Sequence, residues 1–175
     1  MDSETILKSL RKKPLAPPDL LTQGWSCDQA AIRRILPHRE PFLLLDRLIG
    51  LDLDQAVLAA SRRIDPGDPV LRGHFPGLPV YPGALQVEMI GQAGLCLYSF
   101  LERQSREIAA EPRPLKVRAT KILGAHFLES VLPGQEVMVV VKKLAQDPYL
   151  ASVQGQVIYA GRICAAALCE VCFLE

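Results

Sequence analysis

The feature that most constrains the fold of this chain is one long apolar helix near its middle. Residues 84–101 contain no Pro, and apolar side chains recur on nearly every face of a helix built from them. A helix of that kind is stable only when other parts of the protein enclose it. The stretch is marginal in length for a bilayer and carries Gln86, Glu88 and Gln92, so it predicts a buried helix and not a membrane span. We expect this helix to run from Ala84 to about Glu102.

Strand-like segments flank this helix on both sides. They span residues 42–49 and 56–64 before it, and residues 117–131, 137–144 and 150–174 after it, the last divided near residues 160–161. A short helix is expected over residues 29–36, with Asp28 as its N-cap and Pro37 at its end. Residues 65–83 are rich in Gly and Pro and predict a loop. This order predicts an α+β fold, in which an antiparallel sheet wraps around a single central helix.

Residues 25–175 are expected to form a single domain, because a chain of this length can bury a hydrophobic core without disulfides or metal ions. Residues 1–24 are expected to be a partly disordered N-terminal extension. Its first ten residues can form one or two amphipathic turns, after which Pro14, Pro17 and Pro18 favour extended chain.

The composition argues against several classes of partner. The chain has 20 Lys and Arg against 19 Asp and Glu, a net charge of +1, and only 6% aromatic residues. That balance gives no reason to expect binding to nucleic acid or to a membrane surface. The first twenty residues carry charges throughout and lack an apolar core of signal-peptide length, so a soluble cytoplasmic protein is expected.

Five cysteines, an odd number, have no disulfide-framework spacing and indicate a reducing compartment. Cys169 and Cys172 have the spacing of a metal or redox motif. In a strand, however, residues three apart face opposite sides of the sheet, so these two thiols cannot share a metal ion. We therefore interpret the cysteines as small buried hydrophobic residues and expect no metal site.

One segment carries the residues of an acid–base site. It places His74 in a tight loop between Gly and Pro residues, and Glu88 fourteen residues later on the buried helix. A carboxyl group in an apolar helix tends to remain protonated, and Gln92 lies one turn further on the same face, where it can hydrogen-bond to it. A neutral imidazole that accepts a proton and a carboxylic acid that donates one form an acid–base pair. Gly83 stands at the helix start, where unpaired backbone N–H groups can hold an oxyanion.

The same residues also have a purely structural interpretation. His74 would then be a loop residue bonded to the backbone, and Glu88 a core residue paired with an arginine. The presence of both residues within one Gly- and Pro-rich frame favours the acid–base site.

Three segments occur in an order and spacing that match a known family: residues 37–47 (PHREPFLLLDR), 73–77 (GHFPG) and 82–92 (PGALQVEMIGQ). From about residue 28 to its end, the chain resembles the FabZ-type (3R)-hydroxyacyl-[acyl-carrier-protein] dehydratases of fatty acid synthesis. This resemblance implies a hot-dog fold, in which a curved antiparallel sheet wraps around one long central helix, and an enzyme that needs no metal or organic cofactor. It also implies a homodimer, or a larger assembly of dimers, in which each active site takes its histidine from one subunit and its carboxylate from the other.

By the same resemblance, His74 removes the α-proton of a 3-hydroxyacyl thioester, and Glu88 protonates or orients the departing hydroxyl, so that water and a trans-2-enoyl thioester are released. The N–H of Gly83 binds the thioester oxygen, and the carbonyl of Val80 fixes the tautomer of the histidine. The expected partner is an acyl carrier protein that presents the acyl chain on phosphopantetheine. The further residues assigned to the substrate-binding surroundings are Phe75, Gly77, Pro82 and Gln92.

The acyl length and the pathway stay open at this level. Residues 68–71, Gln86 and the polar stretch 103–114 depart from the family pattern, which permits polyketide or aryl-polyene synthesis as well as fatty acid synthesis. His126 is interpreted as structural or exposed, and His38 as structural. The alternatives in function are an enoyl-CoA hydratase or thioesterase of the same fold, and a non-catalytic acyl-binding or scaffold subunit. Because both members of the acid–base pair are present, the dehydratase is favoured.

Basic residues support a second hypothesis. They could gather near the mouth of the acyl tunnel that the resemblance implies and receive an acidic carrier protein there, or they could be ordinary solvated charges. The residues concerned are Arg33, Arg34, Arg39, Arg62, Arg63, Arg72, Arg113, Lys116 and Arg118.

Overall fold

The computed structural model describes residues 2–17, 19–22, 24–109 and 115–174. The helices are α1 (Ser3–Leu10), α2 (Gln29–Ile35), α3 (Pro69–Gly73) and α4 (Gly83–Arg103). The strands are β1 (Arg47–Asp52), β2 (Val57–Arg63), β3 (Val117–Phe127), β4 (Glu136–Gln146), β5 (Leu150–Tyr159) and β6 (Arg162–Phe173).

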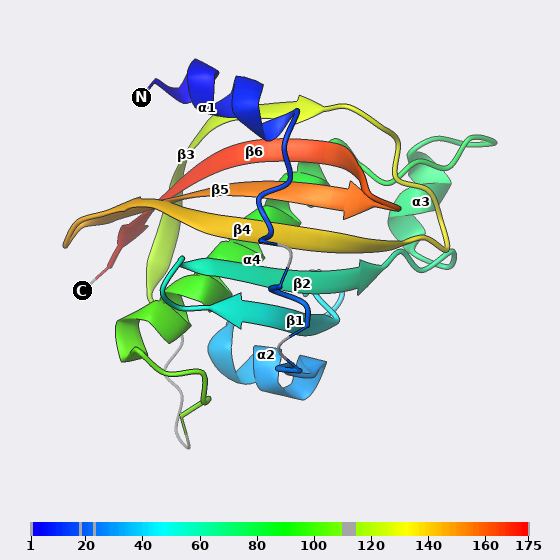
Figure 1. Ribbon diagram of the computed structural model, residues 1–175. Helices are drawn as coiled ribbons and strands as arrows, with labels where there is room; N and C mark the ends of the chain where they lie inside the picture. The colour runs from blue at the N-terminus through cyan, green and yellow to red at the C-terminus, as the bar shows by residue number, and fades with distance from the viewer. Residues whose placement is uncertain (1, 18, 23, 110–114, 175) are drawn as a thin grey trace.

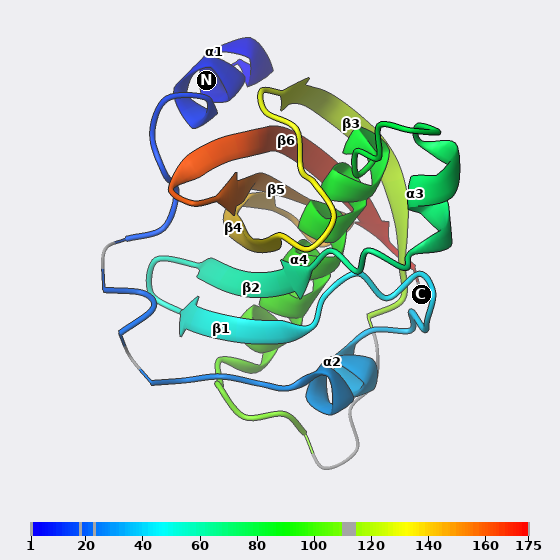
Figure 2. The same ribbon diagram turned by 90° about the vertical axis from the view of Figure 1, so that its right-hand side faces the viewer.

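The strands form one curved antiparallel sheet in the order β1-β2-β4-β5-β6-β3. Helix α4 lies on the inner side of this curve, and the sheet wraps around it (Figures 1 and 2). Strand β3 closes one edge of the sheet and pairs with β6, although it precedes β4 in the sequence. The α+β hot-dog architecture predicted from the sequence is therefore confirmed.

Helix α4 forms the centre of the main core. It begins directly after Pro82, and it ends at Gln104, which adopts the left-handed conformation with φ 49°. The side chains of Met89, Ile90 and Leu97 are fully buried in the main hydrophobic cluster, and burial of each contributes about 1.5–3 kcal/mol. The expectation of an enclosed helix in this stretch is confirmed. None of the described helices combines the length and the hydropathy needed to cross a bilayer.

Two segments before α4 differ from the expected elements. The predicted strand over residues 42–49 begins only at Arg47, because the backbone of Phe42 and Leu44 hydrogen-bonds to the side chain of Gln92 and not to a neighbouring strand. The predicted loop over residues 65–83 contains helix α3, which Asp68 caps by accepting a hydrogen bond from Val70 N at 3.0 Å.

The N-terminal segment lies against the sheet. Residues 3–10 form α1, as the expected amphipathic turns, and an arm, residues 11–17, crosses the outer face of β6, β5 and β4 (Figure 1). The packing of this segment on the sheet was not predicted. Leu7 and Leu10 are buried against β3 and β6. The side chain of Gln156 on β5 accepts from Leu15 N at 2.8 Å and donates to the carbonyls of Leu10 and Lys13. The outer face of the sheet is apolar here, so the arm shields this surface from water. Met1, Pro18 and Gln23 lie outside the described residues.

Candidate active site

His74 and Glu88 line two separate cavities of the chain. The histidine cavity, about 380 Å³ in volume, lies between the loop that follows α3, the start of α4 and the end of β3. The glutamate cavity, about 200 Å³, lies further along α4, next to the start of β3. Because the two residues line different cavities, one chain alone does not place them around a single substrate.

His74 directly follows helix α3, and its backbone N–H donates to Val70 O at 3.1 Å. Its Nδ1 lies 2.9 Å from Val80 O. Since a carbonyl oxygen can only accept, Nδ1 carries the proton of this contact, and in the neutral ring Nε2 is the nitrogen that can accept a proton, as a general base requires. The contact with Val80 is the one that the sequence resemblance implied.

The rest of the GHFPG loop surrounds this histidine. The Phe75 ring stacks on the imidazole, with ring centroids 4.1 Å apart, and remains 53% exposed. Gly77 forms the turn with φ +79°, a conformation that side chains with a Cβ rarely adopt. Phe75 and Gly77 therefore shape the loop, but neither belongs to the lining of the histidine cavity.

Gly83 begins helix α4 at the wall of the histidine cavity. Its N–H belongs to the first turn, where backbone donors have no intrahelical acceptor. The Phe127 ring packs directly over it, so a Cβ on Gly83 would lie only 2.7 Å from a ring carbon. Pro82 is the N-cap of the helix and sets its start without lining the cavity.

Glu88 is held by Gln92, as predicted from their spacing on the helix. Gln92 Nε2 donates to Glu88 Oε1 at 2.8 Å and to Phe42 O at 2.8 Å, and Gln92 Oε1 accepts from Leu44 N at 2.9 Å. The titratable side chain beside Glu88 is a histidine, His38, whose Nε2 lies 3.7 Å from Glu88 Oε1. Among the described residues, the alternative of a core glutamate paired with an arginine is thus not observed.

The residues that line these cavities include several outside the predicted set, among them His38 and Phe127. His38, interpreted as structural, lines the glutamate cavity beside Glu88. Phe127, at the end of β3, lines the histidine cavity. The sequence signal for His38 was its place in the PHREPF segment, but nothing in the sequence indicated that this segment reaches α4.

Gln86 and Tyr81 place buried polar atoms in the wall of the histidine cavity. Gln86 Oε1 and the Tyr81 hydroxyl are buried without a hydrogen-bond partner in the described part of the chain. Burial raises the pKa of Tyr81 to about 12, so the hydroxyl is neutral at physiological pH.

Several of the basic residues are engaged within the chain. Arg62 pairs with Asp46 at 2.8 Å, Arg33 pairs with Glu40, and Arg39 donates to the carbonyls of Leu36 and His38. These side chains hold the segments around the cavities together. Arg113 lies outside the described residues.

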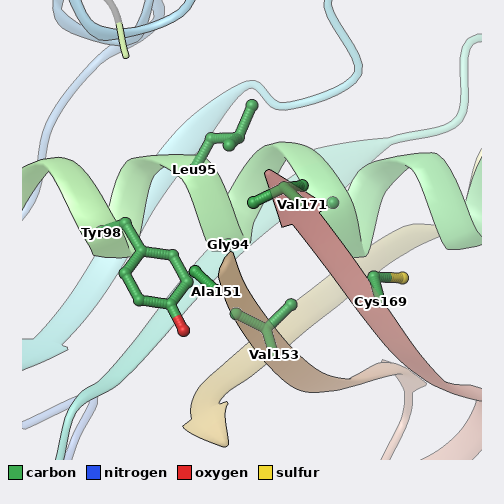
Figure 3. Close-up of a pocket in the computed structure, with 8 residues that line it drawn as sticks. Gly94, Leu95, Tyr98, Ala151, Val153, Cys169 and Val171 are labelled. Atoms are coloured by element: carbon green, nitrogen blue, oxygen red, sulfur yellow. The ribbon is translucent and has the colours of Figure 1, made fainter. Parts of the chain in front are cut away.

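A third, apolar cavity of about 20 Å³ lies between α4, β5 and β6 (Figure 3). It shares Gly91, Leu95 and Val171 with the glutamate cavity. Cys169 lines it, and burial, with a smaller contribution from the Glu88 carboxylate, raises the pKa of this thiol to about 11. A neutral thiol is a poor metal ligand, and no three His, Cys, Asp or Glu side chains gather at one point in the described residues.

Comparisons with known proteins identify the family of this chain. The FabA-like domain matches residues 36–167. The 3-hydroxyacyl-[acyl-carrier-protein] dehydratase FabZ of Campylobacter curvus is 34% identical over 140 residues, 80% of this chain and 93% of that protein. FabZ of Vibrio campbellii is 30% identical over 151 residues, 85% of this chain and 95% of that protein.

Among solved structures, the dehydratase heterocomplex ApeI:P from Xenorhabdus doucetiae aligns with a TM-score of 0.60 at 20% identity, covering 82% of this chain and 91% of that chain. At this identity the likeness concerns the fold. With the family match and the FabZ relatives, the sheet curved around α4 leads to one conclusion: the chain belongs to the FabA-like family of hot-dog proteins.

Proposed function

We propose that this protein is a 3-hydroxyacyl-[acyl-carrier-protein] dehydratase that converts a (3R)-hydroxyacyl thioester into a trans-2-enoyl thioester and water. The observation that carries the proposal is His74, held through Nδ1 by Val80 O, next to the N-terminus of the helix that also bears Glu88. A thioesterase or a non-catalytic acyl-binding subunit does not require this pair, whereas removal of water from C2 and C3 requires both a base and an acid.

The proposed enzyme is a homodimer built on the edge of β3. Among the described strands this strand pairs only with β6, and Ile122 at its midpoint is 64% exposed. Antiparallel pairing of β3 with its copy around Ile122 would set Phe127 beside Val117 of the partner subunit. Phe127 lines the histidine cavity and Val117 the glutamate cavity, so this pairing would join each His74 to Glu88 of the partner subunit.

The chemistry then follows from the two side chains. His74 Nε2 takes the α-proton from C2. The electron pair of the broken C2–H bond forms the C2=C3 double bond as the C3–O bond breaks, and the hydroxyl leaves as water with the proton of Glu88. Charge that develops on the thioester oxygen is stabilised by the N–H of Gly83, a type of donor worth about 3 kcal/mol. Return of a proton from His74 to Glu88 through water resets the site.

The glutamate cavity, of about 200 Å³, supports the assignment of an acyl substrate, because Gly91, Leu95 and Val171 give it an apolar wall beyond Glu88. The cavity in Figure 3 shares these three residues, but its volume of about 20 Å³ leaves room for little more than one water, so the acyl tail would lie in the glutamate cavity. The names of the FabZ relatives specify 3-hydroxyacyl substrates on acyl carrier protein. We propose that this protein also acts on substrates carried by acyl carrier protein. We further propose that it acts in fatty acid synthesis in the cytoplasm.

The decisive experiment tests the pair and the shared site together. Purified wild-type protein should interconvert 3-hydroxyacyl and trans-2-enoyl thioesters carried on acyl carrier protein, and His74→Ala and Glu88→Gln should each abolish turnover without loss of folding. Co-refolding the two variants creates mixed dimers in which one site recovers an intact pair. About a quarter of the wild-type activity should return if dimers form at random.

The outcome separates two arrangements. If each chain carried a complete site, every site in the mixed dimer would contain one defect and no activity would return. Wild-type turnover by either single variant would disprove the assigned residues.

A further inference from the structure

The segment that precedes β1 brings a second histidine to the acidic half of the site. His38 Nε2 lies 3.7 Å from Glu88 Oε1, and the two side chains are 24% and 32% exposed. Gln92 Nε2 donates to the same oxygen at 2.8 Å. Two groups of this chain therefore face Oε1 of Glu88, and both line the glutamate cavity.

The surroundings of His38 determine which ring nitrogen holds its proton. Nδ1 is buried, and no described residue forms a hydrogen bond with it. In the Nδ1–H tautomer, Nδ1 would be a buried donor without an acceptor. In the Nε2–H tautomer, Nδ1 is only an unpaired acceptor, which costs less free energy, and Nε2–H is the donor. The neutral tautomer with its proton on Nε2 is favoured, and this N–H is on the side of Glu88.

The backbone around His38 is fixed by the same network that holds Glu88. Arg39 Nη1 donates to His38 O at 2.7 Å and to Leu36 O at 2.9 Å. Four residues further on, Phe42 O accepts from Gln92 Nε2, the donor that also holds Glu88. The hydrogen bonds of Arg39 and Gln92 therefore fix the backbone of residues 36–42, and with it the position of His38 relative to the carboxyl group of Glu88.

We propose that His38 is a positioning residue that donates from Nε2 to Glu88 Oε1 during the reaction, an inference that rests on the proposed dehydratase function. The present 3.7 Å separation is longer than a hydrogen bond, and contacts of this kind tighten when substrate fills a site. With His38 and Gln92 both on Oε1, Oε2 is the oxygen that carries the proton to the departing hydroxyl. The two donors also stabilise the carboxylate left behind.

The groups that face Glu88 are His38, Gln92 and the Cys169 thiol of β6. The raised pKa of Cys169 keeps this thiol neutral. Gln92 already donates to Glu88 Oε1, so His38 is the neighbour whose N–H can still move into hydrogen-bond range as charge develops on Glu88. His38 itself gains and loses no proton in the proposed role.

The test compares two amide substitutions in the full-length protein. In His38→Gln the amide nitrogen occupies the place of Nε2 and can reach Glu88, whereas in His38→Asn it occupies the place of Nδ1 and cannot. We expect His38→Asn to lower kcat about tenfold or more with KM changed less than about twofold, and His38→Gln to stay within about threefold of wild type. The pH profile of kcat for His38→Gln should keep both limbs of the wild-type profile.

Three results would overturn the proposal. They are wild-type kcat in His38→Asn, equal losses in both variants, and a lost limb in the pH profile of His38→Gln, which would make His38 a titrating group. Thermal melting checks that both variants fold, and an equally lowered melting temperature in the two would indicate a structural role instead. If wild-type protein itself shows no turnover, the proposed function fails; if it turns over and His38→Asn does too, only the role of His38 fails.

Discussion

At the scale of single residues, two tyrosines show how much one hydroxyl group depends on its surroundings. Tyr98 is buried, and its hydroxyl lies 2.8 Å from Ser152 O and 3.0 Å from Ala145 O. Tyr81 is equally buried, but its hydroxyl has no hydrogen-bond partner among the described residues. The first hydroxyl ties α4 to the bulged pairing of β4 and β5, whereas the second has been removed from water without compensation.

The two tyrosines should therefore respond differently to loss of the hydroxyl. Tyr98→Phe is expected to lower the free energy of unfolding by about 1–3 kcal/mol, because it leaves the buried carbonyl of Ser152 without this donor. Tyr81→Phe is expected to leave the free energy of unfolding within about 0.5 kcal/mol of wild type or to raise it, because it removes an unsatisfied group. Urea denaturation of both variants measures the difference, and equal losses would contradict this account.

At the scale of elements, the N-terminal arm depends on one side chain of the sheet. Gln156 is fully buried on β5 and makes all the side-chain hydrogen bonds recorded between that strand and residues 10–15 of the described chain. Leu7 packs close over Gly124 on β3, where a Cβ would lie 2.3 Å from a Leu7 methyl carbon. Polar anchoring and close packing together explain why a segment with several prolines lies on the sheet.

Gln156→Leu should release this arm. The backbone of Leu10, Lys13 and Leu15 would lose its partners, so trypsin should cleave after Arg11 and Lys12 faster than in wild-type protein, and the melting temperature should fall. Gln146→Leu, at an exposed position on β4, is the matched control and should leave both measurements unchanged. Wild-type cleavage rates in Gln156→Leu would mean that apolar packing alone holds the arm.

The elements that the sequence predicted correctly are those whose backbone hydrogen bonds lie within a helix or between strands. Helix α4 and strands β2 to β6 were predicted because their apolar pattern and their own backbone pairing agree. Residues 42–45 were wrongly predicted as strand because their backbone bonds to the Gln92 side chain, fifty residues away, which no local pattern indicates. The turns of α1 and the extended chain after it were predicted, but their packing on the sheet was not, because its partners are on β5 and β6.

At the scale of the whole molecule, the histidine cavity and the glutamate cavity lie at opposite ends of β3. The types and the spacing of His74 and Glu88 could be predicted from the sequence, because an imidazole and a carboxyl group are common as a base and an acid. The motifs themselves carry no distance between the two side chains; the family resemblance implied a site shared by two subunits, and the fold shows that one chain keeps the two residues in separate cavities. His38 stayed hidden because its contact with Glu88 depends on the path of residues 37–46 across α4.

The proposed pairing of β3 with its copy gives the last prediction. With the two-fold axis near Ile122, the two Ile122 side chains would lie directly opposite one another, so Ile122→Asp would place two carboxylates together and destabilise the dimer. We expect Ile122→Asp to be a folded monomer by sedimentation and circular dichroism, and to lose turnover, because the histidine cavity and the glutamate cavity then each lack their complement. Tyr149→Asp, 75% exposed at the β4–β5 turn, should remain dimeric and active. A dimeric, active Ile122→Asp protein would exclude pairing through this edge, and an active monomer would mean that one chain assembles His74 and Glu88 by itself.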